Sequence, residues 1–260
     1  MLAELEGAAD DVARWRAGLT DTSRYRLTLA LRQALGAAVR WRYMTRNPAV
    51  DAGRNPEPRS EELLPFAPEQ IDALEVELGP MFGPLVTFAA ETGLRTNEWV
   101  ALERRDVDRS GPAVLVQRRY ADGVLTPYPK TVGSRRRVPL SARALAALDR
   151  LPPRLDTVLL FPAARGGHIG LDGWRTRHWY PALEAAGIRQ RGSYQLRHSF
   201  ASEALAAGVS IFELARVMGT SVKMIDRTYG HLASDSEQAI RARLDARSAR
   251  NGVVVASDGD

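Results

Sequence analysis

The stretch Ser193-Tyr-Gln-Leu-Arg-His-Ser-Phe-Ala-Ser202, followed by Thr228-Tyr-Gly-His231, is the most informative part of this sequence. The first stretch opens a helical pattern that runs to about residue 207, and its Tyr194 and Arg197 stand three residues apart, on one helix face. Tyr229 follows Arg197 by 32 residues, at the end of another helical pattern. The sequence therefore predicts a helical region with an arginine near its start and a tyrosine near its end.

Helical patterns also dominate the rest of the chain beyond residue 60. We expect Gly93 to close one of these helices and Thr96 to cap the next one, which would run through Leu102. Two later helices begin with capping boxes, Ser210 with Glu213 and Ser234 with Glu237. The predicted helices span residues 67–78, 81–92, 96–102, 141–150, 171–186, 193–207, 210–218, 221–229 and 234–248.

Three short strands are predicted between these helices, over residues 113–119, 124–130 and 135–140. We expect the last two to form a hairpin across residues 132–134, and the two prolines of the middle strand place it at a sheet edge. The predicted fold class is mainly α (α+β), with a small three-stranded sheet.

The first 60 residues form a separate region. An amphipathic helix over residues 24–44 carries Arg32, Arg40 and Arg42 on its polar faces, and Asn47-Pro48 ends it. The polar segment 51–60, with two prolines, is typical of an interdomain linker. We place a domain boundary near residue 60 and expect a disordered tail over residues 251–260.

Composition restricts the chemistry. The chain has 260 residues, 45% of them hydrophobic, which is enough for a packed core. It has no cysteine and four dispersed histidines, which excludes disulfides and thiolate sites and disfavours structural zinc. Without an apolar run of about 18 residues or a signal peptide, we expect a cytoplasmic protein with no membrane association. We also expect no metal and no cofactor.

Charge favours a polyanionic partner. The net charge is +5 and the pI about 9.9. Of 36 basic residues only Lys130 and Lys223 are lysines. A site that needs a titratable ammonium group is one reason to keep a lysine, because a guanidinium does not lose its proton near neutrality.

Four residues of the chain have the side chains that chemistry on a phosphodiester needs. Arginines pair with phosphate oxygens in a bidentate manner, a tyrosine can attack the phosphorus, and a general acid must protonate the departing sugar oxygen. Arg95 and Arg197, Tyr229 and Lys130 could fill these roles. Each also has an ordinary structural interpretation. Arg95 has Glu98 as a helical ion-pair partner, and Arg197 could form a common surface pair with Tyr194. Lys130 could be an exposed hairpin residue, and Tyr229 could pack a helix end. We assign structural roles to His198 and His231, and core or interdomain packing to Trp99, Trp174 and Trp179.

Five ordered motifs resemble those of the tyrosine recombinase or phage integrase family. Thr92-Gly-Leu-Arg-Thr-Asn-Glu98 is similar to its first arginine box, and residues 129–140 (PKTVGSRRRVPL) resemble its lysine hairpin. Tyr194-Gln-Leu-Arg197 is similar to its His-x-x-Arg box, Met218-Gly-Thr220 to its Leu-Gly-His element, and Tyr229-Gly-His231 to its nucleophile motif. The order and spacing of these motifs over residues 65–250 are more specific than any one of them.

The resemblance implies a catalytic domain over residues 61–250, preceded by a partial helical core-binding (SAM-like) domain in residues 1–60. Arg95 and Arg197 would hold the scissile phosphate, Tyr229 would form a covalent 3′-phosphotyrosine, and Lys130 would protonate the 5′-oxygen. Tyr194 and Thr220 stand where the family usually has histidine, and histidine or tryptophan, so we expect them to support the phosphate only by hydrogen bonds. Plausible DNA contacts are Arg32, Arg40, Arg42, Arg135, Arg136 and Arg175.

The resulting hypothesis is a site-specific DNA recombinase that acts on double-stranded DNA. The resemblance implies a homotetramer in the DNA synapse, with C-terminal segments exchanged between neighbours, and accessory DNA-bending or directionality proteins are possible partners. Two alternatives remain open. The chain could be a catalytically weak or silent DNA-binding homologue that regulates recombination, or a type IB topoisomerase-like nicking and relaxing enzyme.

Overall fold

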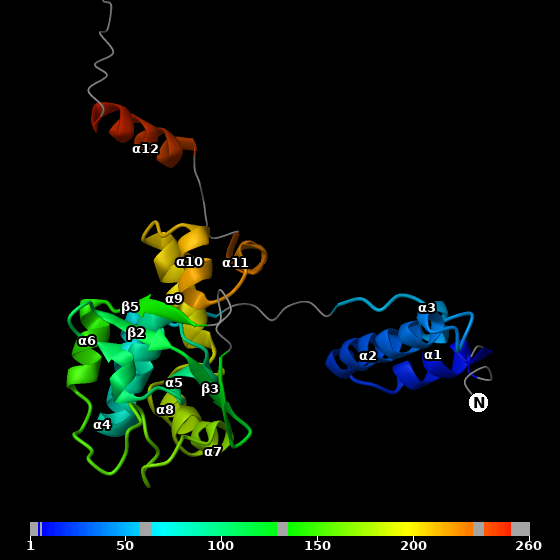
Figure 1. Cartoon of the computed structure of the whole chain (residues 1–260), viewed down its shortest axis with the longest axis horizontal. Helices are drawn as coiled ribbons and strands as arrows, with labels where there is room; N and C mark the ends of the chain where they lie inside the picture. Colours follow the sequence, from blue (N-terminus) through cyan, green and yellow to red (C-terminus); the bar gives the residue numbers. More distant parts are fainter. Residues whose placement is uncertain (1–4, 6, 58–63, 129–134, 231–236, 251–260) are drawn as a thin grey trace, which may run out of the picture. The chain divides into compact units, whose positions relative to one another are not determined.

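The computed structural model describes residues 5, 7–57, 64–128, 135–230 and 237–250 (Figure 1). The chain divides into two compact units, Met1–Glu62 and Leu63–Asp260. Each unit has its own buried hydrophobic cluster, so each is described by itself. No helix in the described part of the chain is both long and apolar enough to span a membrane.

The first unit contains α1 (Ala9–Ala17), α2 (Asp21–Arg40) and the short α3 (Pro48–Asp51). Asn47 caps α3 by accepting a hydrogen bond from the Ala49 amide at 3.0 Å, with proline in the first helical position. The α2 helix ends earlier than the predicted residue 44, because Arg42 has a φ of 63° and turns the chain away. A cluster of small and apolar residues fills the space between the helices: Leu35, Ala38, Met44 and Ala49.

The second unit is built around α4 (Pro68–Thr92), most of whose second half is buried. It consists of two helical parts that meet at Gly79, where φ is 65° and ψ is −174°, so the prediction of two helices here is confirmed. Gly93 ends α4 in the left-handed conformation, as expected. Both α6 (Ala142–Asp149) and α9 (Gln195–Ala206) pack against α4.

The remaining helices complete the second unit. A continuous helical stretch combines α7 (Leu171–Trp174), a π-helical turn over Arg175–Trp179 and α8 (Tyr180–Ala185). The others are α5 (Thr96–Trp99), the 3-10 turn Arg104–Asp106, α10 (Ile211–Met218), α11 (Val222–Tyr229) and α12 (Glu237–Arg250). The predicted capping box of Ser210 and Glu213 is present, whereas Ser234 and the expected tail over 251–260 lie outside the described residues. Trp99, Trp174 and Trp179 are buried in the core, as predicted.

A small antiparallel sheet joins β1 (Val107–Asp108), β2 (Ala113–Val116) and β5 (Arg136–Pro139), in the order β1-β2-β5. A separate two-stranded ribbon contains β3 (Arg118–Ala121) and β4 (Val124–Pro127). The mainly helical fold class with a small sheet is therefore confirmed.

The predicted strand pairing was wrong in one respect. The strand over 124–127 pairs with β3 and not with the strand that follows it, which instead pairs with β2. The Asp122-Gly123 pair makes the tight turn, with φ values of 52° and 78°, and such a dipeptide is a strong hairpin signal. The predicted strand 113–119 is interrupted at Gln117, where the chain leaves the sheet for the ribbon.

Candidate active site

Arg95 lies at the junction between α4 and α5. Its backbone amide donates to Glu98 Oε2 at 2.8 Å, so Glu98 caps the short helix and Thr96, the predicted cap, does not. The Arg95 guanidinium donates to Glu98 Oε1 at 3.1 Å and to the carbonyl oxygen of Gly219 at 2.7 Å. About a third of the side chain remains exposed. The guanidinium is therefore oriented by the protein and still accessible to a ligand.

Glu98 is the centre of a buried ion-pair cluster. Its carboxylate accepts two hydrogen bonds from Arg136, at 2.9 and 2.7 Å, and one from the Tyr128 hydroxyl at 2.9 Å. Burial alone would raise the pKa of Glu98, but the hydrogen bonds and positive charge of Arg136, with those of Arg95, outweigh it and lower that pKa to about 2. Glu98 is thus ionised at neutral pH and fixes two arginines at once.

Arg197, on α9, is the second buried cation of this region. Its side chain is only 4% exposed, and it donates to the carbonyl oxygens of Gly93 at 2.5 Å and Met218 at 2.9 Å. Burial and the nearby Arg95 lower the pKa of Arg197 from its usual value. Arg95 and Arg197 therefore bind consecutive carbonyl groups, Gly219 and Met218, at the end of α10.

Helix ends explain why these carbonyls are available. The last carbonyl groups of an α-helix have no partner within the helix, and they carry partial negative charge. Gly219 ends α10 with a φ of 62°, which turns its own carbonyl and that of Met218 toward the two arginines. A Cβ atom at Gly219 would lie 2.9–3.0 Å from the Arg136 guanidinium, so the position also needs glycine for space.

Tyr229 is the last residue of α11 and is 4% exposed. Its ring belongs to a small apolar cluster formed by α9, α10 and α11, which includes Leu214, Met218 and Ile225. The Tyr229 hydroxyl lies 2.6 Å from Nδ1 of His198. Burial is the main cause that raises the pKa of Tyr229 to about 12, with Tyr194 adding to the rise and Arg197 opposing it.

His198 directly follows Arg197 on α9 and also contacts Tyr194, whose ring meets the imidazole edge-on at 5.3 Å between centroids. Burial, and then the charge of Arg197, lower the pKa of His198 to about 4. We had assigned His198 a structural role, and its contact with the Tyr229 hydroxyl was missed. The available signal was its spacing, because residues four apart on a helix share a face and His198 stands four after Tyr194.

Tyr194 and Thr220, the two other expected site residues, come from the start of α9 and from the residues after α10. Tyr194 is at the start of α9 and is 46% exposed, while Thr220 follows the end of α10 and its amide donates to the Ala215 carbonyl at 3.0 Å. A pocket of about 290 Å³ opens beside Arg95 and includes Arg119 of β3, another residue that the sequence did not suggest. No group of three or more His, Asp or Glu side chains in the described residues could hold a metal ion.

Comparisons with known proteins identify the family of the chain. The model of the phage integrase family matches residues 63–236. The chain belongs to the phage integrase family. A protein described as a prophage phiRv2 integrase of Mycobacterium tuberculosis is 26% identical over 90% of this chain and 65% of its own length. The tyrosine recombinase XerC of Mycobacterium leprae is 27% identical over 84% of this chain and 77% of its own length.

Solved structures of similar fold include the Tn1549 transposon integrase in complex with a circular intermediate DNA. That chain superposes with a TM-score of 0.74, at 19% identity, over 92% of this chain and 86% of the other. The likeness shows that this integrase-family chain has the same fold. The chain spans about two thirds (65%) of the length of the prophage integrase that it matches.

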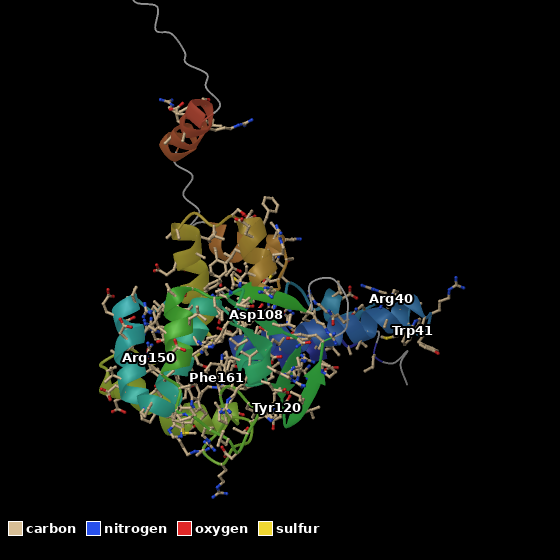
Figure 2. All side chains as sticks on the ribbon, turned by 60° about the vertical axis from the view of Figure 1, so that its left-hand side comes forward. Arg40, Trp41, Asp108, Tyr120, Arg150 and Phe161 are labelled. Carbon is tan, nitrogen blue, oxygen red and sulfur yellow. The ribbon has the colours of Figure 1, made fainter. Side chains whose placement is uncertain are left out.

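The residues expected to contact DNA occupy different environments in this family member. Arg40 is exposed at the end of α2, next to the exposed Trp41 (Figure 2). Arg42 is exposed as well. Arg32 instead donates from Nε to the Ala49 carbonyl at 2.9 Å and also contacts the Gly53 carbonyl, so it holds the first unit together.

In the second unit, Arg136 departs from the expectation. It is 8% exposed, and its guanidinium donates to Glu98 and to the Val217 carbonyl, so it has a structural role here. Arg135 is exposed and donates to the Tyr128 carbonyl at 3.1 Å, and Arg175 pairs with Asp172 at 3.3 Å. Lys130, the expected general acid, lies outside the described residues.

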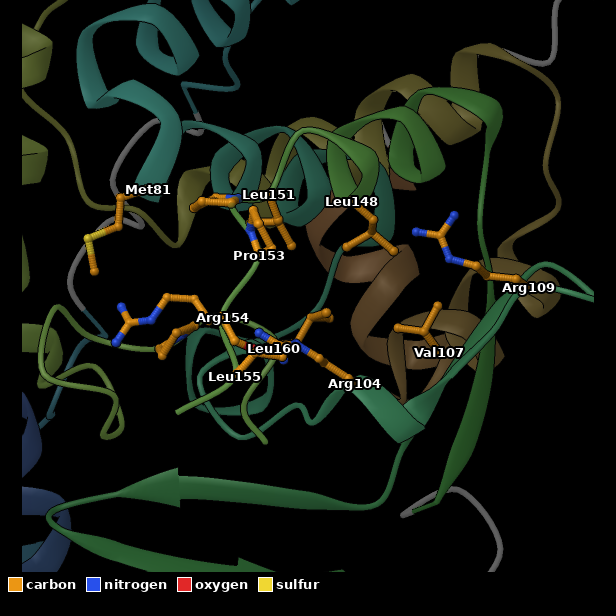
Figure 3. A pocket seen from close by; sticks show the side chains of 12 residues that line it. Met81, Arg104, Val107, Arg109, Leu148, Leu151, Pro153, Arg154, Leu155 and Leu160 are labelled. Carbon is orange, nitrogen blue, oxygen red and sulfur yellow. The ribbon is translucent and has the colours of Figure 1, made fainter. Parts of the chain in front are cut away.

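A larger cavity lies away from these residues. It has a volume of about 360 Å³ and is lined by residues of α6 and of the segments around Arg104 and Pro153 (Figure 3). The arginines at its rim already have partners: Arg109 pairs with Asp149 at 2.7 Å, and Arg154 with Asp156 at 2.5 Å. Among the expected catalytic residues that the structure describes, none lines it.

Proposed function

We propose that this chain is a site-specific DNA recombinase that cleaves and rejoins DNA through a covalent 3′-phosphotyrosine. The observation that carries the proposal is the convergence of Arg95 and Arg197 on the end of α10. Three residues separate this end from α11, the helix that ends in Tyr229. Membership of the phage integrase family supports the same chemistry.

In the proposed reaction, the two arginines bind the non-bridging oxygens of the scissile phosphate and stabilise the charge that accumulates as the phosphorus is attacked. Tyr229 Oη loses its proton to a base and forms the bond to the phosphorus. The bond between the phosphorus and the 5′-oxygen breaks, and this oxygen leaves with a proton from Lys130. Tyr194 and Thr220 support the phosphate by hydrogen bonds. Rejoining reverses these steps with a new 5′-hydroxyl group.

The partners follow from this chemistry. We propose that the chain acts on double-stranded DNA in the cytoplasm and assembles as a homotetramer in the synapse, with α12 exchanged between neighbours. Accessory DNA-bending or directionality proteins belong to the same proposal. Cross-linking on cleaved DNA would show four protomers, and deletion of residues 237–260 would reduce assembly more than it reduces binding by a single protomer.

Covalent capture tests the function directly. The protein would be incubated with a pool of duplexes that carry a randomised segment of about 30 base pairs. Nicks in these duplexes would let the short fragment with the free 5′-hydroxyl group diffuse away after cleavage. Adducts that resist detergent would be recovered and the DNA sequenced. We expect wild-type adducts on a common sequence, none with Tyr229→Phe, and a rate at least roughly 100-fold lower with Arg197→Lys, because lysine cannot contact both phosphate and backbone as a planar fork.

The outcomes separate the proposal from its alternatives. Sequence-selective binding that Tyr229→Phe leaves unchanged, with no adduct under any condition, would indicate a DNA-binding regulator. Relaxation of supercoiled plasmid without sequence preference would indicate a topoisomerase-like enzyme. Adducts that persist in Tyr229→Phe would refute the assignment of the nucleophile.

A further inference from the structure

The hydrogen bond between His198 and Tyr229 joins a nitrogen base to the expected nucleophile. The 2.6 Å distance between Nδ1 and Oη is at the short end for a hydrogen bond, and Tyr229 is almost completely buried. The two residues come from different helices, α9 and α11, which are part of one apolar cluster. The contact is therefore set by the packing of the helices and not by chance at the surface.

The direction of this hydrogen bond decides what His198 can do. A neutral imidazole has one nitrogen that donates and one that accepts. If Tyr229 donates, Nδ1 is the accepting nitrogen and the proton of the ring is on Nε2. Three groups surround the imidazole: the Arg197 guanidinium, the Tyr194 ring and the Tyr229 hydroxyl. Burial and Arg197 both disfavour the charged ring, so the imidazole is neutral at neutral pH and its Nδ1 can accept the hydrogen bond from Tyr229.

His198 also provides an imidazole close to the motif Tyr194-Gln-Leu-Arg197, which itself contains no histidine. Tyr194 stands where the family usually has histidine, and its phenol is a poor base near neutrality. His198 is one helical turn further along the same face, and it contacts both Tyr194 and Tyr229. The imidazole is thus supplied from a position four residues later.

We propose that His198 is the general base that accepts the Tyr229 proton during DNA cleavage, an inference that rests on the proposed recombinase function. As Oη forms its bond to the phosphorus, the hydroxyl proton moves to Nδ1, and the bond between phosphorus and the 5′-oxygen breaks. The 5′-oxygen takes its proton from a separate acid. In rejoining, the phosphotyrosine bond breaks and Nδ1 returns the proton to Oη.

The phosphate assists this transfer. A negatively charged phosphodiester bound by Arg95 and Arg197 would lie close to the imidazole, and a nearby negative charge favours the protonated ring. The base is therefore weak in the free protein and becomes stronger when DNA is bound. This order protects Tyr229 from ionisation in the absence of substrate.

Single-turnover cleavage tests the proposal, with the duplex recovered by covalent capture of the wild-type protein as the probe. His198→Asn places an amide oxygen near the position of Nδ1, so it keeps an acceptor but cannot take a proton. We expect it to form adduct at a rate lower by roughly 10² to 10³, with an unchanged melting temperature. His198→Ala should show a rate that rises about tenfold per pH unit above neutrality, since hydroxide must take the proton. His178→Asn, whose ring packs on Phe82 elsewhere in the unit, is the matched control.

A substrate with sulfur in place of the bridging 5′-oxygen separates base from acid. A thiolate leaves without a proton, so this duplex should restore cleavage to Lys130→Ala but not to the His198 variants. Restoration of the His198 variants would place the residue on the leaving-group side and overturn the proposal. If the His198 variants form adduct as fast as the wild-type protein, the base assignment is overturned as well. The recombinase function would remain intact in that case.

A measurement on the free protein is independent of DNA. Nitrogen-15 NMR of the histidine rings should show His198 as the neutral tautomer with its proton on Nε2. Among the histidines, only His198 should show a large change in its ring nitrogen chemical shifts in Tyr229→Phe. A proton on Nδ1 would overturn the assignment. If the wild-type protein forms no adduct with any duplex, the proposed function fails and the base assignment fails with it, even if the tautomer is as expected.

Discussion

At the scale of single residues, we expect Glu98 to contribute strongly to stability. It is fully buried, pairs with Arg136 and orients Arg95. Replacement by glutamine would leave the Arg136 guanidinium buried without a counter-charge, and such losses cost about 3–5 kcal/mol. We expect Glu98→Gln to lower the free energy of unfolding by this order, measured by urea denaturation. Glu77→Gln, an exposed residue of α4, should change it by less than about 0.5 kcal/mol.

The same carboxylate predicts how stability depends on pH. The pKa of Glu98 in the folded protein, about 2, lies below the ordinary value of 4.5. The unfolded chain therefore binds the proton first as pH falls, so the stabilisation is complete above pH 4.5 and is lost toward pH 2. The expected loss is about 3 kcal/mol. A Glu98→Gln protein with an equally steep acid transition would contradict this.

At the scale of elements, the junction between α10 and α11 restricts which residue can occupy position 219. Gly219→Ala would place a Cβ atom against the Arg136 guanidinium and force alanine into a left-handed backbone. We expect a loss of about 1–3 kcal/mol in unfolding free energy. Cleavage should fall by more than this loss of folded protein explains, because the Gly219 carbonyl positions Arg95. Gly192→Ala, where a Cβ atom meets nothing within 4 Å, is the control, and equal effects at both glycines would refute the argument.

The end of α2 is a second element with a testable role. Arg40, Trp41, Arg42 and Tyr43 are all exposed there, and the two aromatic rings meet edge-on at 6.4 Å. If the arginines contact DNA phosphates, Arg40→Ala and Arg42→Asn should each lower the affinity for DNA. Each should also reduce the slope of the logarithm of the binding constant against the logarithm of the salt concentration by about one. Asparagine is chosen because it tolerates the left-handed backbone at residue 42. Binding measured against salt concentration should be unchanged in Arg14→Ala, an exposed arginine of α1.

Sequence patterns predicted most elements because each leaves a local signal. Ser210 and Glu213 mark the start of α10, and Gly93 marks the end of α4. Strand pairing depends instead on contacts between distant residues, so β5 was assigned to the wrong neighbour although Asp122-Gly123 marked the true hairpin. The arginine pair and Tyr229 were predicted from motifs. The roles of Arg136 and His198 were not, because a buried ion pair and a contact between two helices depend on tertiary packing.

At the scale of the whole molecule, the two units have separate cores. Leu35 belongs to the cluster of the first unit, while Leu85 belongs to that of the second. We expect Leu35→Ala to lower the unfolding transition of the first unit only, and Leu85→Ala that of the second only, each by about 2–5 kcal/mol. Differential scanning calorimetry of the full chain would distinguish the two transitions. A single transition shifted equally by both variants would show that the units unfold together.

Arg95 and Arg197 each have one carbonyl partner at the end of α10, while Glu98 and the Gly93 carbonyl hold their other nitrogens. A partner or a DNA bend that displaced this helix end by about 1 Å would remove one anchor from each guanidinium, and misplacement of this size can cost about 100-fold in rate. Movement of this one helix end would therefore weaken the contact of both arginines with the phosphate at the same time, and the rate of the proposed strand cleavage would fall.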